Sequence, residues 1–156
     1  NRYVNDEKIA QTVAQMLSRA GIDTKVEAMP SNVFFSRGSR LDFSFMLVGW
    51  GSGTGETSSP LKSLLGTFSK EKGWGPSNRG RYSNPKMDAV LDKALMTVDD
   101  KARQALLAEA SEIGIGDLGI IPIHYQINTW ATKKGLTYLA RTDENTLAHE
   151  VKPAKK

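Results

Sequence analysis

The sequence contains no cysteine, and this absence excludes several kinds of site. A chain of 156 residues without cysteine forms no disulfide, uses no thiolate in catalysis and holds no Cys-ligated zinc, although the redox compartment stays open. Histidine is nearly as scarce: His124 and His149 are far apart and belong to neither a HExxH motif nor another ligand spacing. We therefore expect no metal site built from this chain.

Long apolar runs and a targeting segment are also missing. No stretch approaches the roughly 18 apolar residues that a membrane helix needs. The start, "NRYVNDEK", has neither a Met nor the basic-then-apolar plan of a signal peptide, so we expect a mature form or an excised piece. A composition of 39% hydrophobic and 24% charged residues fits one globular domain with a sizeable core.

Catalytic spacings are equally absent. No Gly-x-Ser-x-Gly elbow occurs, and no nucleophile is paired with a base. Asp88 and Asp92 lie one helical turn apart among lysines, which is most simply a solvated face. His124 beside Tyr125 is more often a structural pair than a general base. We therefore expect a protein that is not an enzyme, with hydrolysis of small amides as a distant alternative.

The net charge is +4, but the basic residues are spread along the chain rather than clustered. Such a distribution is more often a solvated surface than a nucleic-acid footprint. One alternative stays open, because segment 69–81, "SKEKGWGPSNRGR", interleaves Lys70, Lys72, Arg79 and Arg81 with Trp74. Base stacking on the Trp with phosphate contacts from the cations describes an autonomous basic α/β module that binds nucleic acid.

The first third of the sequence alternates helix and strand patterns. Residues 6–20 carry one apolar helical stripe and are followed by Gly21 as a C-terminal cap. Residues 22–28 alternate apolar and polar side chains as a half-buried strand does, and a short helix is expected over 31–40. Residues 43–50, nearly all apolar, resemble an inner strand. Strand, helix and strand at this spacing predict a right-handed parallel crossover, so the fold class is α/β.

Three further helices are predicted. Ser59 is a candidate N-cap ahead of a proline, for a short helix that runs to about residue 65. Asn84 caps the next helix, and Thr97 with Asp100 matches a capping box for the one after it. We expect the last two helices to pack as a pair.

The last part of the chain offers one more strand. Residues 119–135, "GIIPIHYQINTWATKKG", favour a strand, and Pro122 places it at an edge or at a bend because proline cannot donate to the ladder. The tail after residue 133 shows weak periodicity, and we find no internal repeat.

The Gly-rich stretch "GWGSGTGE" joins the predicted inner strand to the following helix. It is not a P-loop, because Glu56, which repels phosphate, stands where that motif needs its Gly-Lys pair. The dinucleotide fingerprint fails at the same position, since its third glycine would be Glu56. Glycines between a strand end and a helix start still suit a ligand pocket. The other interpretation is that Gly51, Gly53 and Gly55 allow a tight turn and Trp50 belongs to the core.

The order of these segments resembles a known family. The likeness rests on "NDEKIAQTVAQMLSRAGIDTKVE", "FSFMLVGWGSGTGETSSPLKSLL", "GRYSNPKMDAVLDKAL" with "DDKARQALLAEASEIG", and "LGIIPIHYQINTWATKKGL". Together, and in this order, they resemble the family 5 extracytoplasmic solute-binding proteins of ABC importers, which bind peptides, glutathione or nickel. The likeness covers nearly the whole chain.

The resemblance implies a fold and a function. The chain, residues 1–156, is expected to be a single domain, excised from the C-terminal part of the larger lobe of a two-lobe protein. That lobe has the periplasmic-binding-protein (type II, Venus-flytrap) fold, a mixed, mostly parallel sheet flanked by helices. The two lobes close on a peptide or similar small solute and deliver it to an ABC permease, so we expect a periplasmic protein that uses no cofactor and catalyses no reaction.

The resemblance also implies which residues line the ligand cleft. They are the Trp at the strand end and the residues after it, namely Trp50, Gly51, Ser52, Gly53 and Thr54. In peptide-binding members an Asp soon after that Trp pairs with the ligand's free amine, whereas here the first acid is Glu56, which serves only if the loop turns it inward. Asn78, Arg79 and Tyr82 occupy a segment that approaches the cleft in relatives, and Tyr125 follows the "IIP" turn. Arg79 is either a bidentate partner for a ligand carboxylate or a solvated loop residue.

Overall fold

The computed structural model describes residues 5–141 and 143–154. These residues form two compact units, one ending at Ile121 and the other starting at Pro122. The first unit carries the helices α1 (Asp6–Arg19), α2 (Ser31–Ser39), α3 (Ser58–Pro60), η1 (Leu61–Leu65), α4 (Pro85–Met96) and α5 (Asp100–Gly116). Within the described ranges, none of these helices has the length and apolar character needed to cross a bilayer.

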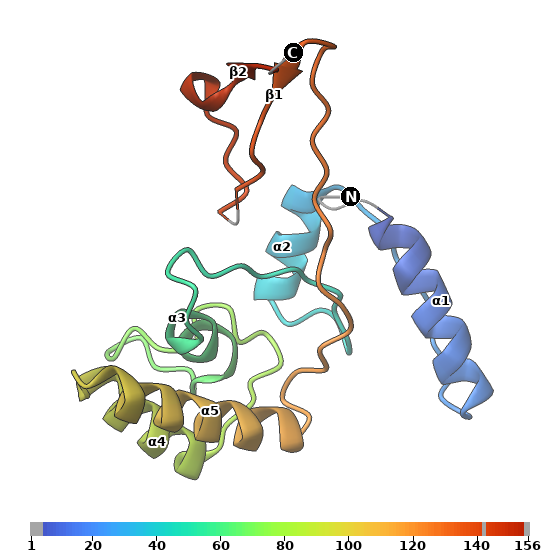
Figure 1. Ribbon diagram of the computed structural model, residues 1–156. Helices are drawn as coiled ribbons and strands as arrows, with labels where there is room; N and C mark the ends of the chain where they lie inside the picture. Colours follow the sequence, from blue (N-terminus) through green and yellow to red (C-terminus); the bar gives the residue numbers. More distant parts are fainter. Residues whose placement is uncertain (1–4, 142, 155–156) are drawn as a thin grey trace. The chain divides into compact units, whose positions relative to one another are not determined.

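The core of the first unit lies where α4 and α5 pack together against η1 (Figure 1). Its side chains come from these helices and from the loop between η1 and α4: Leu61, Leu65, Trp74, Met87, Leu91, Ala94, Leu107 and Ala110. A Cβ on Gly114 of α5 would lie 2.7 Å from Leu65 Cδ1, so a glycine is needed for this close approach. The predicted pairing of the last two helices is confirmed.

The caps of these helices differ in how well local sequence predicts them. Asn84 accepts hydrogen bonds from the N–H groups of Lys86 and Met87 at 2.9 and 3.1 Å, as predicted for an N-cap. The capping-box prediction for α5 is wrong: Asp99 is the N-cap, and its carboxylate accepts from Ala102 N at 2.8 Å. Thr97 instead ends α4, where its hydroxyl donates to Lys93 O.

The short helix after the glycines also starts earlier than predicted. α3 begins at Ser58 rather than after Ser59, and Thr57 at its N-cap makes no side-chain capping bond. The chain then widens into the π-helix η1, which ends at Leu65, close to the predicted end. Proline at position 60 lacks an N–H, which is tolerated in a first helical turn.

Helices α1 and α2 match the predicted ranges, and α1 is closed by Gly21 at φ 90°. The N–H of Ile22 donates to Leu17 O at 2.9 Å, a bond typical of a glycine C-cap. The apolar stripe of α1 is poorly covered, however, since Ala14 is its only buried residue and Met16 is 59% exposed.

The predicted parallel sheet is not found among the described residues. None of residues 22–28, 43–50 and 119–135 is in a strand, and residues 23–29, 43–51 and 120–132 make no backbone-to-backbone hydrogen bond. The only ladder in the described ranges pairs β1 (Leu136–Thr137) antiparallel with β2 (Lys152–Pro153) in the second unit. A strand requires hydrogen bonds to a neighbouring strand, and these apolar segments have no such neighbour among the described residues.

Candidate functional site

The Gly-rich loop is an open turn held by its own hydroxyls. Ser52 Oγ donates to Glu56 O at 2.7 Å and lies 3.2 Å from Thr54 Oγ1. Gly55 has a φ of 73°, and its N–H donates to Ser52 O at 3.3 Å, so this glycine serves the turn. Trp50 is 45% exposed and is not part of the core.

The other two glycines of the loop are not explained by the turn. Neither Gly51 nor Gly53 has a positive φ, and a Cβ added at either position would meet no atom within 4 Å. The described part of the chain therefore imposes no steric need for glycine at these positions. The backbone beside Trp50 is accessible from solvent, as a ligand-contacting loop requires.

The Glu56 carboxylate already has hydrogen-bond partners within the first unit. Its two carboxylate oxygens accept from Arg103 Nε at 2.9 Å and Arg103 Nη2 at 2.6 Å, and Ser58 Oγ donates to the same carboxylate. Hydrogen bonds from Arg103 first and Ser58 second lower the pKa of Glu56 to about 2, against a smaller opposing effect of burial. The side chain points toward α5.

Asn78 is buried, and both its side-chain nitrogen and its side-chain oxygen form hydrogen bonds with backbone groups of the same unit. Its amide nitrogen donates to Gly66 O at 3.0 Å and Tyr82 O at 2.7 Å, and its oxygen accepts from Tyr82 N at 3.0 Å. These bonds close the loop ahead of α4. Asn78 is therefore placed as a structural residue of this loop.

Arg79 is the one basic residue among the predicted site residues, and it forms no ion pair within the described part of the chain. Its guanidinium carbon lies 5.3 Å from the centre of the Phe35 ring on α2. Its Nε is buried without a hydrogen-bond partner among the described residues. Gly38 of α2 makes room, because a Cβ there would lie 3.0 Å from Arg79 Cδ and 2.5 Å from Met46 Cε. A carboxylate reaching this guanidinium would meet an unpaired charge.

Tyr82 joins a polar cluster at the start of α4 rather than an open surface. Its hydroxyl donates to Asp117 Oδ2 at 2.8 Å, and Asn84 Nδ2 donates to the same oxygen at 2.5 Å. Burial, followed by the bond to Asp117, raises the pKa of Tyr82 to about 12. The bonds from Asn84 and Tyr82 lower the pKa of Asp117.

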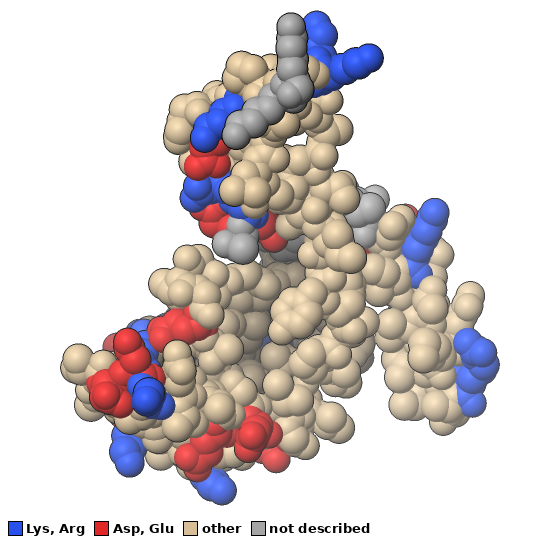
Figure 2. Space-filling view, in the orientation of Figure 1, with Lys and Arg blue, Asp and Glu red and all other residues tan. Residues whose placement is uncertain are grey.

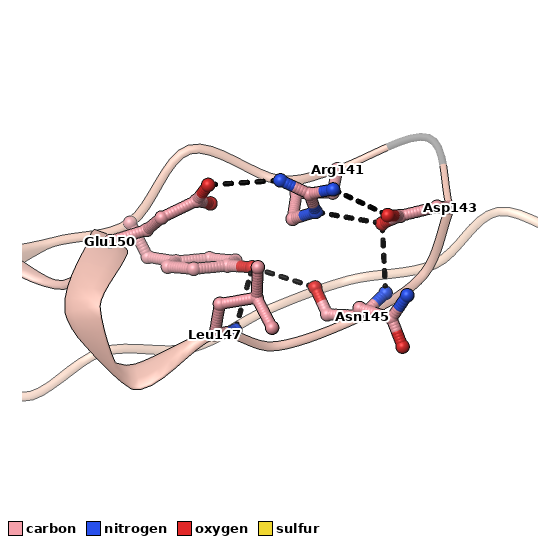
Figure 3. Close-up of polar contacts among 6 residues, drawn as sticks. Arg141, Asp143, Asn145, Leu147 and Glu150 are labelled. Atoms are coloured by element: carbon pink, nitrogen blue, oxygen red, sulfur yellow. Dashed lines mark hydrogen bonds and ion pairs between the residues drawn. The ribbon is translucent and has the colours of Figure 1, made fainter.

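Tyr125 lies in the second unit and is 98% exposed. It therefore belongs to a different unit from the residues predicted around the Gly-rich loop. The polar contacts of this unit are elsewhere: Arg141 bonds Asp143 at 2.5 and 2.8 Å and Glu150 at 2.9 Å (Figure 3). The Arg141 guanidinium holds the pKa of Asp143 well below its usual range, and the cluster ties the turn before η2 (Ala148–Glu150).

Nothing in the structure supports nucleic-acid binding by segment 69–81. Trp74 is only 8% exposed and belongs to the core, so its ring is not offered to a base. The guanidinium carbon of Arg81 lies 4.0 Å from the centre of the Phe68 ring, so this cation already has an aromatic partner. On the face seen in Figure 2, Lys and Arg lie in several separate places rather than in one stripe. No group of three metal-ligating side chains occurs within residues 5–141 and 143–154.

Sequence reasoning missed Arg103 and Ser58 as neighbours of the Gly-rich loop. Arg103 is 47 positions from Glu56 in the chain, so no local spacing links them. The i+2 spacing of Glu56 and Ser58 was the one available signal, since a hydroxyl two positions after a carboxylate is within reach of it.

Comparison with known proteins finds relatives over most of the chain. The glutathione-binding protein GsiB of Pectobacterium atrosepticum is 31% identical over 116 residues, 68% of this chain and 21% of the relative. The oligopeptide-binding protein OppA of Bacillus subtilis is 26% identical over 130 residues, 83% of this chain and 23% of the relative. The dipeptide-binding protein DppE of Bacillus subtilis is 29% identical over 120 residues, 76% of this chain and 21% of the relative.

No family model and no solved structure matches the chain. The chain spans about a fifth to a quarter of the length of these curated relatives. Each of the three is named as a binding protein, and together they confirm the resemblance seen in the sequence. The chain is therefore similar, over most of its length, to family 5 extracytoplasmic solute-binding proteins.

Proposed function

We propose that this chain is part of the ligand-binding lobe of a two-lobe solute-binding protein, which captures a peptide or similar small solute outside the cytoplasm and delivers it to an ABC permease. The printed functions of the relatives, which are oligopeptide, dipeptide and glutathione binding, support this solute class. Binding without catalysis fits a chain whose sequence offers no paired nucleophile and base.

The observation that carries the proposal is the state of the Gly-rich loop. Trp50 is about half exposed, and Gly51 and Gly53 leave empty space where side chains would stand. A ligand lying there would meet an aromatic wall, hydroxyls and bare backbone N–H groups, which are the groups that binding sites use for orientation. The unpaired Arg79 supplies a cation for a ligand carboxylate.

The same proposal accounts for the three apolar segments that have no strand partner among the described residues. In a lobe with a mixed, mostly parallel sheet, segments 22–28, 43–50 and 119–135 would pair with strands from the rest of the parent protein. Their apolar side chains, among them Ile22, Phe45 and Ile123, are 56%, 57% and 47% exposed in this chain. Exposed apolar segments of this kind need covering.

The experiment is a thermal-shift screen of the full-length parent protein with dipeptides, oligopeptides, glutathione and nickel chelates. A ligand at a hundredfold excess over its Kd stabilises the folded state by about 2.7 kcal/mol, which raises Tm by a measurable amount. We expect peptides or glutathione to raise Tm and nickel chelates to leave it unchanged. A screen in which no peptide and no glutathione shifts Tm contradicts the proposed function.

A further inference from the structure

The Glu56–Arg103 contact is built with more bonds than an ordinary surface ion pair. Both oxygens of the carboxylate and two nitrogens of the guanidinium take part, at 2.6 and 2.9 Å, in the fork geometry that arginine favours. The two side chains are 34% and 21% exposed, and the buried Ser58 adds a third donor. An exposed ion pair with a single hydrogen bond would stabilise the conformation of the loop less.

Arg103 also connects the loop to the helix pair. Its remaining terminal nitrogen, Nη1, donates to Ala94 O at 2.8 Å, near the C-terminal end of α4. That carbonyl is one of the last four of the helix, which lack a partner within it. One guanidinium on α5 therefore holds the end of α4 and the carboxylate of the Gly-rich loop at the same time.

From Glu56 the contacts continue into the loop itself. Its backbone carbonyl accepts from Ser52 Oγ, which lies beside the Thr54 hydroxyl. A continuous set of hydrogen bonds thus runs from α5 through Glu56 to the two hydroxyls next to Trp50. Among the described residues, the bond from Gly55 N to Ser52 O is the one backbone hydrogen bond within this loop, and residues 43–51 make none.

We infer that Glu56 and Arg103 are positioning residues that fix the Gly-rich loop for its ligand, and that Glu56 is not the anchor for a ligand's free amine. This inference rests on the proposed function. A ligand amine that paired with the Glu56 carboxylate would have to displace Arg103 and Ser58 from it. The half-buried guanidinium of Arg103 would then be left without its partner, which is energetically costly. The amine of a peptide ligand must then be recognised elsewhere or left in solvent.

The first test measures the loop without any ligand. Amide hydrogen exchange of residues 52–61 in the full-length protein, which include the Gly55 and Leu61 donors, is compared among Glu56→Gln, Arg103→Gln and Arg103→Lys. We expect roughly tenfold faster exchange in both Gln variants and a smaller increase in Arg103→Lys, which keeps the charge but loses the fork. Glu27→Gln, which removes an ion pair of 2.7 Å with Arg37, is the matched control and should leave this peptide unchanged.

The second test separates positioning from amine binding. Affinities for trialanine and glutathione and for their N-acetylated forms are measured by calorimetry on wild type and Glu56→Gln. We expect acetylation to change affinity by the same factor in both proteins, and Glu56→Gln to weaken all four ligands together. An acetylation penalty that is present in wild type and absent from Glu56→Gln overturns the inference, as does exchange in both Gln variants that matches the Glu27→Gln control. If wild type binds none of the four probes the proposed function fails, and the exchange result alone decides the role of Glu56 and Arg103.

Discussion

At the scale of single residues, the polar side chains near the Gly-rich loop divide into those used by the fold and those left over. Asn78 and Glu56 have their hydrogen-bonding groups engaged by neighbours within the first unit. Trp50, Thr54 and Arg79 keep exposed or unpaired groups, whereas the Ser52 hydroxyl is already bonded to Glu56 O. The second set carries the proposed ligand contacts, because an interaction with a solute requires a group that the fold has not already used.

Asn78→Ala should destabilise the chain by about 2–4 kcal/mol, since it leaves three backbone groups, Gly66 O, Tyr82 O and Tyr82 N, without their partner. Urea unfolding of the purified chain measures this. Asn32→Ala, on the exposed surface of α2, is the control and should change stability by no more than about 0.5 kcal/mol. A loss below about 1 kcal/mol for Asn78→Ala would show that water replaces its bonds.

The Glu56–Arg103 pair predicts a specific pH dependence. The pKa of Glu56 is lowered in the folded state from an ordinary value of 4.5 to about 2, so the unfolded chain takes up its proton first as the pH falls. The stabilisation is therefore complete above about pH 5 and is lost progressively between pH 4.5 and 2. Unfolding free energies of wild type and Glu56→Gln should differ most at pH 7, and the difference should shrink as the pH falls from 4.5 toward 2; a difference that does not shrink would argue against this pairing.

At the scale of elements, helices could be predicted from local sequence while strands could not. Asn84 with Pro85 predicts the start of α4 because an N-cap bonds groups two and three positions away. Strand segments 22–28 and 43–50 have the right composition, but a ladder needs a neighbour that no local pattern supplies. The contact between Glu56 and Arg103 is hidden from sequence for the same reason, because it depends on tertiary packing.

The cap of α5 offers a test at this scale. Asp99→Ala should cost about 1 kcal/mol, because it removes the acceptor of Ala102 N, whereas a capping box centred on Thr97 would make Thr97→Ala the costlier change. Thermal unfolding followed by circular dichroism compares the two variants. A larger loss for Thr97→Ala would reinstate the capping box.

At the scale of the whole molecule, the uncovered apolar surface of this chain follows from its place in a longer protein, as proposed above. Met16, Phe45 and Ile127 are 59%, 57% and 84% exposed, and none is needed by the core formed by η1, α4 and α5. The chain spans only about a fifth to a quarter of its relatives. Surface of this kind is what a neighbouring lobe or sheet would bury.

The isolated chain should therefore bind the solute weakly. In a two-lobe protein the ligand is enclosed by both halves, so we expect the 156-residue chain to bind at least about 100-fold more weakly than the full-length protein. Calorimetry of both with the same peptide provides the comparison. Affinities within about threefold of each other would mean that this chain alone holds the complete site.

The most direct test of the central claim is the affinity of full-length Trp50→Ala for the solute that the thermal-shift screen identifies. Loss of an aromatic wall from a binding site should weaken binding by about tenfold or more, or about 1.4 kcal/mol. Met96→Ala, which removes another exposed apolar side chain at the end of α4, is the control and should bind as wild type does. A Trp50→Ala protein that folds and binds with wild-type affinity would contradict the assignment of the Gly-rich loop as the ligand site.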